Sequence, residues 1–361
     1  MGDWFTLSKQ DGQYLSYLQG TFSNQVRAIP QRPMDGRVNT NFMTFRLVAV
    51  EMIKRPALWK IWWRALRPSL LTLSLSPCLV IWGMSLLLEE QTPRVPIWQV
   101  LNVLLVLGLF QASLHLLNDY FDHMSGKDRA DDRTGSRIIQ NGWLPAYALY
   151  RFGVGLMLSG ALLALPILWE QNWLVWGGAL AALLGGGLFS LAQSHRLWLG
   201  VQELILFVLA GPMLTASFYY LLFGQWSWWA SSVGIFFGLL AAAAFHLNHL
   251  EEIFLTERSG RRTLVGWLGF ERSKRLLYLI LGGAALSLLT LIFAGPMWPV
   301  GSLGLLFFLF LVGMLTARIH RSPSFASSGL IQVRYAALRI HWLLGLFLSV
   351  STALLSLYKN L

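Results

Sequence analysis

Residues 97–122 read IWQVLNVLLVLGLFQASLHLLNDYFD, an uncharged apolar run that ends in an acidic cluster. The run from 97 to 117 is long enough to cross a bilayer as one helix, because a hydrocarbon core of roughly 30 Å needs about 20 apolar residues. The carboxylates that follow would lie at the membrane boundary, where a charge is costly unless a cation compensates it. This stretch therefore predicts a membrane helix whose end holds a cation.

The composition extends this prediction to the whole chain of 361 residues. Hydrophobic residues make up 55 % of the sequence and charged residues only 12 %, about half of the ~25 % charged share of soluble proteins. Mean hydropathy is +0.54. These values exclude a soluble globular enzyme, a disordered chain and a fibre. The single cysteine, Cys78, excludes a disulfide framework, a cysteine-based zinc site and an iron–sulfur cluster.

The fold class that we predict is an all-α polytopic membrane protein with about nine transmembrane helices. If the N-terminus is cytoplasmic, every Lys and Arg except Arg94 and Lys359 lies on the cytoplasmic side. This distribution predicts an outside C-terminus, and it accounts for the net charge of +11 without a nucleic-acid partner. The apolar windows are 69–88, 97–117, 148–168, 173–192, 201–222, 228–248, 276–294, 298–317 and 341–358.

Two parts of the chain are distinguished by composition. Residues 1–45 are rich in polar residues and are predicted to be a polar N-terminal tail, and 46–361 form the membrane domain. Within the membrane domain, 51–67 reads EMIKRPALWKIWWRALR, in which basic residues stand beside three tryptophans. Such a segment is typical of a helix that lies on the inner leaflet of the bilayer.

The first acidic motif follows the second window. On a helix, Asn118, Asp119 and Asp122 share one face, because residues three and four apart are neighbours. Mg²⁺ is commonly bound by one or two carboxylates together with phosphate oxygens of the substrate. Arg133 and Arg137 follow and offer donors to phosphate oxygens. The motif therefore predicts a metal–phosphate site.

A second motif repeats this pattern about 130 residues later. Asn248 and Glu252 stand in the same Asn-x-x-x-acid relation as Asn118 and Asp122, and the basic pair Arg261-Arg262 follows. The alternative interpretation is that both motifs are ordinary solvated cytoplasmic loops. The seven histidines are too dispersed for a membrane di-iron oxygenase, although His246 and His249 lie near Glu252.

Several stretches resemble the UbiA superfamily of intramembrane aromatic prenyltransferases, and within it the menaquinone branch, which prenylates 1,4-dihydroxy-2-naphthoate. The first acidic motif is the most specific of them, and Glu203 belongs to a stretch that resembles the family's helix-5 signature. In the second motif, Glu252 and Thr256 stand where the family has two Asp, and Gln202 stands where the menaquinone branch has Gly. The stretches are 64–77 (RALRPSLLTLSLSP), 111–128 (QASLHLLNDYFDHMSGKD), 135–144 (GSRIIQNGWL), 200–220 (GVQELILFVLAGPMLTASFYY) and 260–264 (GRRTL).

The resemblance implies Mg²⁺-dependent transfer of a polyprenyl group from its diphosphate to an aromatic acceptor, with loss of carboxylate from a naphthoate. Asp119, Asp122 and Glu252 would bind the metal and Asp128 would assist them. The other residues that it implies in substrate binding are Asn118, Lys127, Arg133, Arg137, Glu203, Asn248, Arg261 and Arg262.

Two alternatives remain open at this point. The altered second motif favours a prenyltransferase that acts on a different aromatic acceptor. A non-catalytic membrane binding or transport protein could also be built on this scaffold, although the intact first motif argues against it. We expect a multi-pass protein of a bacterial inner membrane, with the lipid bilayer as its surroundings and the active site on the cytoplasmic side. The oligomeric state does not follow from the sequence.

Overall fold

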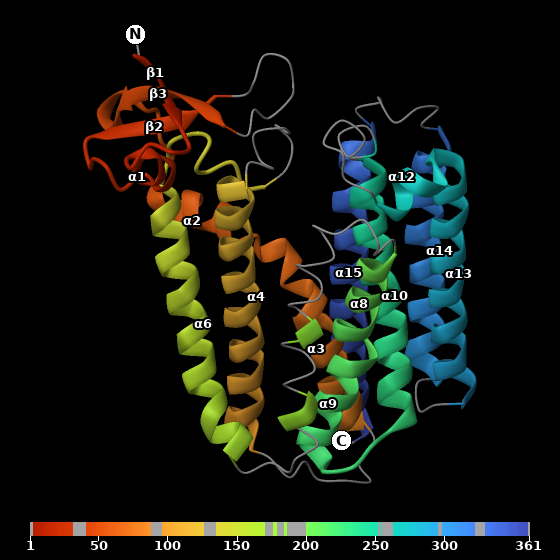
Figure 1. Cartoon of the computed structure of the whole chain (residues 1–361). Helices are drawn as coiled ribbons and strands as arrows, with labels where there is room; N and C mark the ends of the chain where they lie inside the picture. Colours follow the sequence, from red (N-terminus) through yellow and green to blue (C-terminus); the bar gives the residue numbers. More distant parts are fainter. Residues whose placement is uncertain are drawn as a thin grey trace. The chain divides into compact units, whose positions relative to one another are not determined.

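The computed structural model describes residues 3–31, 41–87, 96–125, 135–169, 176–178, 184–185, 200–251, 253, 263–294, 298–321 and 329–359 (Figure 1). The chain forms two compact units. The first comprises Met1–Pro68 and Gly108–Leu162, and the second comprises Ser69–Leu107 and Leu163–Leu361. The first acidic motif belongs to the first unit, whereas Glu203 and Asn248 belong to the second.

The first unit begins with a small antiparallel sheet, where the sequence analysis expected a polar tail over 1–45. Strands β1 (Trp4–Ser8), β2 (Val26–Pro30) and β3 (Phe42–Ala49) pair in the order β1-β3-β2, and helix α1 (Tyr14–Gln19) follows β1. Alternation along β3 turns Met43 and Phe45 to one face, where they form a core with Leu7, Tyr14 and Leu18. The strands are too short to register in a search for membrane-length apolar windows, and the expected boundary at 45/46 falls inside β3.

The rest of the first unit is helical. The 3-10 helix η1 (Val50–Met52) leads to α2 (Leu58–Leu66), which buries Ile61 and Ala65 and leaves Trp59 and Trp63 exposed. Helix α2 lies within the segment 51–67, for which the sequence predicts an interfacial helix. It is amphipathic, with one buried and one exposed face. Residues 108–125 of α4 (Ile97–Ser125) and 146–162 of α6 (Ala146–Trp169) belong to this unit and run side by side (Figure 1), and the Ser113 hydroxyl donates to the Gly153 carbonyl at 2.7 Å.

The second unit is a helical bundle. Helix α10 is its most enclosed member, with 72 % of its apolar window buried, and helix α3 packs against α15, where Gly83 faces Thr352 and Gly345 faces Ser76. The elements are η2 (Pro68–Leu70, which begins at the unit boundary), α3 (Thr72–Leu87), α8 (Val201–Leu209), α9 (Pro212–Phe223), α10 (Trp228–Glu251), α12 (Leu264–Leu268), α13 (Phe270–Ala294), α14 (Trp298–Arg321) and α15 (Gly329–Lys359).

The helical, multi-pass character predicted from composition is confirmed. Among the described residues, seven helices are long and apolar enough to cross a membrane, or up to eight if the bent pair Leu58–Leu70 and Thr72–Leu87 forms one span. The predicted window 173–192 falls mostly outside the described residues. The count of nine spans and the positions of the two termini stay predictions.

The predicted window 201–222 is broken into α8 and α9 at Gly211-Pro212. Pro212 has no N–H to donate to the preceding turn and restricts the backbone of Gly211. A Cβ on Gly211 would lie 2.7 Å from the Cα of Gly238, and a Cβ on Gly234 would lie 2.7 Å from the carbonyl carbon of Gly211. Three glycines therefore let the backbones of the α8–α9 break and of α10 touch.

We predict that Gly234→Ala destabilises the protein by about 1–3 kcal/mol or more, because the added methyl group meets backbone atoms that no rotamer change can move. Gly313→Ala in α14 is the matched control, since nothing lies within 4 Å of a Cβ built there. Thermal unfolding in detergent measures both variants. Equal midpoints for the two variants would contradict the close approach.

Candidate functional site

The first acidic motif lies at the end of α4, and its central carboxylate is buried within the first unit. Asp119 is only 3 % exposed. Its Oδ1 forms an ion pair with the guanidinium of Arg67, and its Oδ2 accepts a hydrogen bond from the backbone N–H of Ser136 at 3.3 Å. The cation compensates the buried carboxylate, so Asp119 is held with both oxygens engaged.

Arg67 is a site residue that the sequence analysis did not single out. It caps the C-terminus of α2 in the left-handed region, with φ of 48°, directly before Pro68. This unusual backbone position for a residue other than glycine ends the helix and directs the chain onward. Arg67 and Asp119 are 52 residues apart, so no local pattern in the sequence could have paired them.

The segment that begins at Gly135 lies against α4. Ser136 stands between two residues in the left-handed region, Gly135 at 75° and Arg137 at 61°. The next residues, Ile138 and Ile139, are buried in a cluster that includes Leu116 and Tyr120 of α4. This packing explains how a backbone N–H seventeen residues after Asp119 reaches its carboxylate.

The other members of the motif lie further from the core. Asn118 is exposed and Asp122 is half-buried on the same side of α4, one helical turn apart. The ring of His123 donates from Nε2 to the Leu18 carbonyl at 2.9 Å, and Gln19 Nε2 donates to the Tyr120 hydroxyl at 3.2 Å. The N-terminal sheet domain is therefore joined directly to the helix end that carries the motif.

A second polar cluster lies within the second unit, which we name the Glu203 cluster: Glu203, His246 and His249. Glu203 occupies the first turn of α8, and both histidines are on α10. The Oε1 atom of Glu203 lies 3.2 Å from Nδ1 of His249 and 3.8 Å from Nδ1 of His246. All three residues are buried, at 7 %, 0 % and 8 % exposure in sequence order.

The structure shows which side chains contact Glu203. The resemblance implies Glu203 in substrate binding, and the structure brings this residue together with His246 and His249, which the resemblance does not include. The sequence feature that could have indicated these two histidines is their three-residue spacing, which places them on one face of α10 just before the second motif. Asn248, half-buried, and Glu251 lie on the same helix end. The predicted site residues outside the described part of the chain are Lys127, Asp128, Arg133, Glu252, Arg261 and Arg262.

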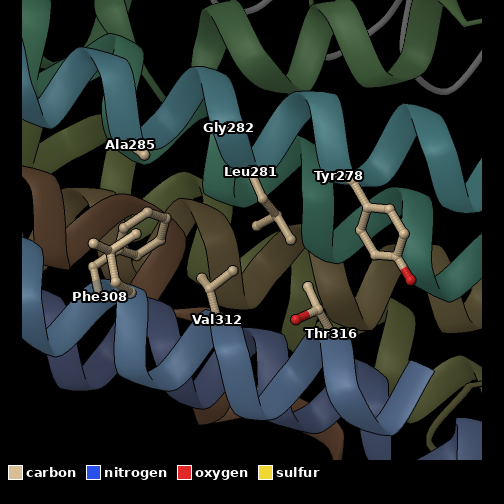
Figure 2. A pocket seen from close by; sticks show the side chains of 8 residues that line it. Tyr278, Leu281, Gly282, Ala285, Phe308, Val312 and Thr316 are labelled. Atoms are coloured by element: carbon tan, nitrogen blue, oxygen red, sulfur yellow. The ribbon is translucent and has the colours of Figure 1, made fainter. Parts of the chain in front are cut away.

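The second unit also has an apolar groove between α13 and α14 with a volume of about 340 Å³ (Figure 2). Its lining holds no charged side chain, and hydroxyls of Tyr278 and Thr316 supply its polar atoms. The groove can receive a hydrocarbon chain but offers no group for acid–base or metal chemistry. The lining residues are Tyr278, Leu281, Gly282, Ala285, Phe308, Leu309, Val312 and Thr316.

The fold has counterparts among solved structures. A UbiA homologue from Archaeoglobus fulgidus bound to DMAPP and Mg²⁺ superposes with a TM-score of 0.55 at 15 % identity, over 78 % of this chain and 98 % of that one. A digeranylgeranylglyceryl phosphate synthase structure gives a TM-score of 0.54 at 16 % identity, over 82 % and 98 %. At this level of identity the likeness concerns the fold alone.

Sequence relatives and a family model extend the likeness. The chain is 26 % identical to a 1,4-dihydroxy-2-naphthoate octaprenyltransferase of Mycobacterium tuberculosis, over 56 % of this chain and 70 % of the relative. It is 27 % identical to an enzyme of the same name from Haemophilus influenzae, over 63 % and 75 %. The model of the UbiA prenyltransferase family matches residues 75–334, which include both acidic motifs. The chain therefore belongs to the UbiA prenyltransferase family.

Proposed function

We propose that this prenyltransferase moves a polyprenyl group from its diphosphate to 1,4-dihydroxy-2-naphthoate in a Mg²⁺-dependent reaction. Two relatives carry the name of that activity, and a third, from Synechocystis, is a 2-carboxy-1,4-naphthoquinone phytyltransferase at 24 % identity, over 62 % of this chain and 71 % of that one. All three names describe prenylation of a carboxylated naphthalene ring. The acceptor is therefore inferred from the relatives, and the donor chemistry from the motif.

The observation that carries the proposal is the end of α4. Asn118, Asp119 and Asp122 offer a set of oxygen donors with no sulfur or imidazole among them, which is the donor set that suits Mg²⁺. Arg67 and Ser136 contact the two oxygens of Asp119, so this carboxylate is held in place at the helix end. Asp122 then lies one turn from Asn118 at the less enclosed side.

These residues suit cleavage of an allylic diphosphate. Mg²⁺, when bound, supplies positive charge that stabilises the leaving diphosphate. The basic residues around the motifs would donate to the diphosphate oxygens, and the apolar helix faces would exclude water from the allylic carbon. We assign metal binding to Asp119, Asp122 and Glu252 with help from Asp128, and diphosphate binding to Lys127, Arg133, Arg137, Arg261 and Arg262.

We predict that Asp122→Asn lowers prenyl transfer by more than about 100-fold, because it removes a charged metal ligand while keeping the side-chain shape. The assay uses purified protein, geranyl diphosphate, Mg²⁺ and 1,4-dihydroxy-2-naphthoate, with chelator as a second arm. Glu271→Gln is the control, since this side chain is 68 % exposed and pairs only with Lys274 among the described residues. Turnover of Asp122→Asn near that of the wild type would contradict the assignment.

The second motif gives a separate prediction. Glu252 stands four residues after Asn248, as Asp122 stands after Asn118, whereas Thr256 offers only a neutral hydroxyl. We therefore expect Glu252→Gln to raise the Mg²⁺ concentration that gives half-maximal rate, and Thr256→Ala to leave it unchanged. Magnesium titrations of both variants measure this difference. A shift in Glu251→Gln or Glu257→Gln, with none in Glu252→Gln, would move the ligand to a neighbouring position.

We further propose that the protein resides in a bacterial inner membrane with its acidic motifs on the cytoplasmic side. The asymmetry of Lys and Arg supports this orientation. A reporter that works only in the cytoplasm, fused after Leu361, should then be inactive, and the same reporter placed in the 126–134 segment should be active. Strong cytoplasmic signal from the C-terminal fusion would show that the number of spans is even.

A further inference from the structure

The three side chains of the Glu203 cluster are buried, and their contacts indicate which ring nitrogens carry a hydrogen. Nε2 of His246 faces the Ser273 carbonyl oxygen at 3.1 Å. A carbonyl oxygen only accepts hydrogen bonds, so this nitrogen carries a hydrogen. Nδ1 of a neutral His246 would then be a lone pair facing the Glu203 carboxylate.

That arrangement leaves Nδ1 of His246 without a hydrogen-bond donor in the part of the chain that the structure describes. His246 is fully buried, and its Nδ1 has no hydrogen-bond partner among the described residues. Two electron-rich atoms 3.8 Å apart repel each other in a medium of low dielectric constant. The hydrogen bond of the Glu203 carboxylate is therefore made to His249, at 3.2 Å, and not to His246.

His249 is placed differently. A carboxylate only accepts, so the 3.2 Å contact with Glu203 puts a hydrogen on Nδ1 of His249. In the neutral form of the ring the lone pair is then on Nε2, for which the described residues supply no hydrogen-bond partner. The His249 side chain is 11 % exposed, against 0 % for His246. An imidazole oriented by a carboxylate through one nitrogen, with the other nitrogen available, is the arrangement of a general base.

The proposed reaction needs such a base. A hydroxylated aromatic ring attacks more readily as its oxyanion, and His249 is three residues before Glu252, at the helix end that carries the second motif. We propose that His249 removes the hydroxyl proton of the aromatic acceptor, with Glu203 and His246 as positioning residues, an inference that rests on the proposed function.

The acceptor O–H bond breaks, the proton moves to Nε2 of His249, and the electron pair stays on oxygen and extends into the ring. The allylic C–O bond breaks with its pair on the leaving diphosphate, and a ring carbon forms the new C–C bond. With 1,4-dihydroxy-2-naphthoate, the carboxylate leaves as CO₂, its bonding pair restores the aromatic ring, and the proton returns to the oxygen. Glu203, whose carboxylate accepts the hydrogen bond from Nδ1 of His249, stabilises the positive charge that forms on that ring.

The test separates this role from one in helix packing. In His249→Asn, the amide nitrogen takes the place of Nδ1 and keeps the hydrogen bond to Glu203, while the basic nitrogen is lost. We expect kcat for transfer from geranyl diphosphate to 1,4-dihydroxy-2-naphthoate to fall about 100-fold or more, with the donor KM changed by less than about threefold. His320→Asn, on an exposed position of α14, is the matched control and should behave as the wild type.

A second acceptor supplies a readout that a packing role would not move. A ring-fluorinated 1,4-dihydroxy-2-naphthoate has a more acidic hydroxyl and needs less help to lose its proton, so the deficit of His249→Asn should narrow to less than about tenfold. His249→Gln, with a non-basic amide at the Nε2 position, should show the same pattern and serves if His249→Asn does not fold. Glu203→Gln should lower kcat as well, because it removes the charge that orients His249.

Each outcome decides a different question. A folded His249→Asn or His249→Gln with kcat within threefold of the wild type would overturn the inference, and so would an equal deficit with both acceptors. The proposed function would survive that result. If the wild type transfers no prenyl group to any hydroxylated aromatic acceptor, the proposed function fails and this inference fails with it.

Discussion

The close approach of Gly211 to Gly234 and Gly238 is the constraint on which the second unit depends. In a bilayer the hydrophobic effect provides little driving force for helices to associate, because lipid tails are themselves apolar. Close van der Waals packing across small residues therefore supplies much of the attraction. The contact also sets the register of α8 against α10. The two helices run in opposite directions. Glu203 lies eight residues before Gly211 and His246 lies eight residues after Gly238, so the glycine contact brings these two side chains to the same level. A shift of one turn would separate the carboxylate from both histidines.

Charge compensation follows the same rule in both units. A buried carboxylate in an apolar helix is tolerated when a cation or a set of donors neutralises it. Asp119 meets Arg67 and the Ser136 N–H, and Glu203 meets two imidazoles. Each acid is held by residues of its own unit and lies near an apolar helix end. The difference is chemical: Arg67 keeps its proton, whereas an imidazole can exchange one.

The N-terminal sheet adds a feature outside the family match, which begins at residue 75. The sheet domain touches the first motif through His123 and Tyr120, each of which forms a hydrogen bond with the segment Leu18–Gln19. Gly20, in the left-handed region, packs against Pro145 at the start of α6. The domain therefore braces α4 and α6 at the end where the loop 135–144 returns to Asp119. These contacts lie within the same unit as the motif, as does the ion pair between Arg67 and Asp119.

The sequence by itself determined the apolar helices, the first motif and its place at a helix end, because hydropathy and three- or four-residue spacing are local properties. It also pointed to Glu203 through a resemblance. Only the tertiary structure decided which residues each acid meets: Arg67 lies 52 residues from Asp119, and His249 lies 46 residues from Glu203. It alone showed the break at Gly211-Pro212 and the sheet over 4–49. Contacts between distant segments depend on how helices and strands pack, and packing depends on the shapes of all the surfaces that meet.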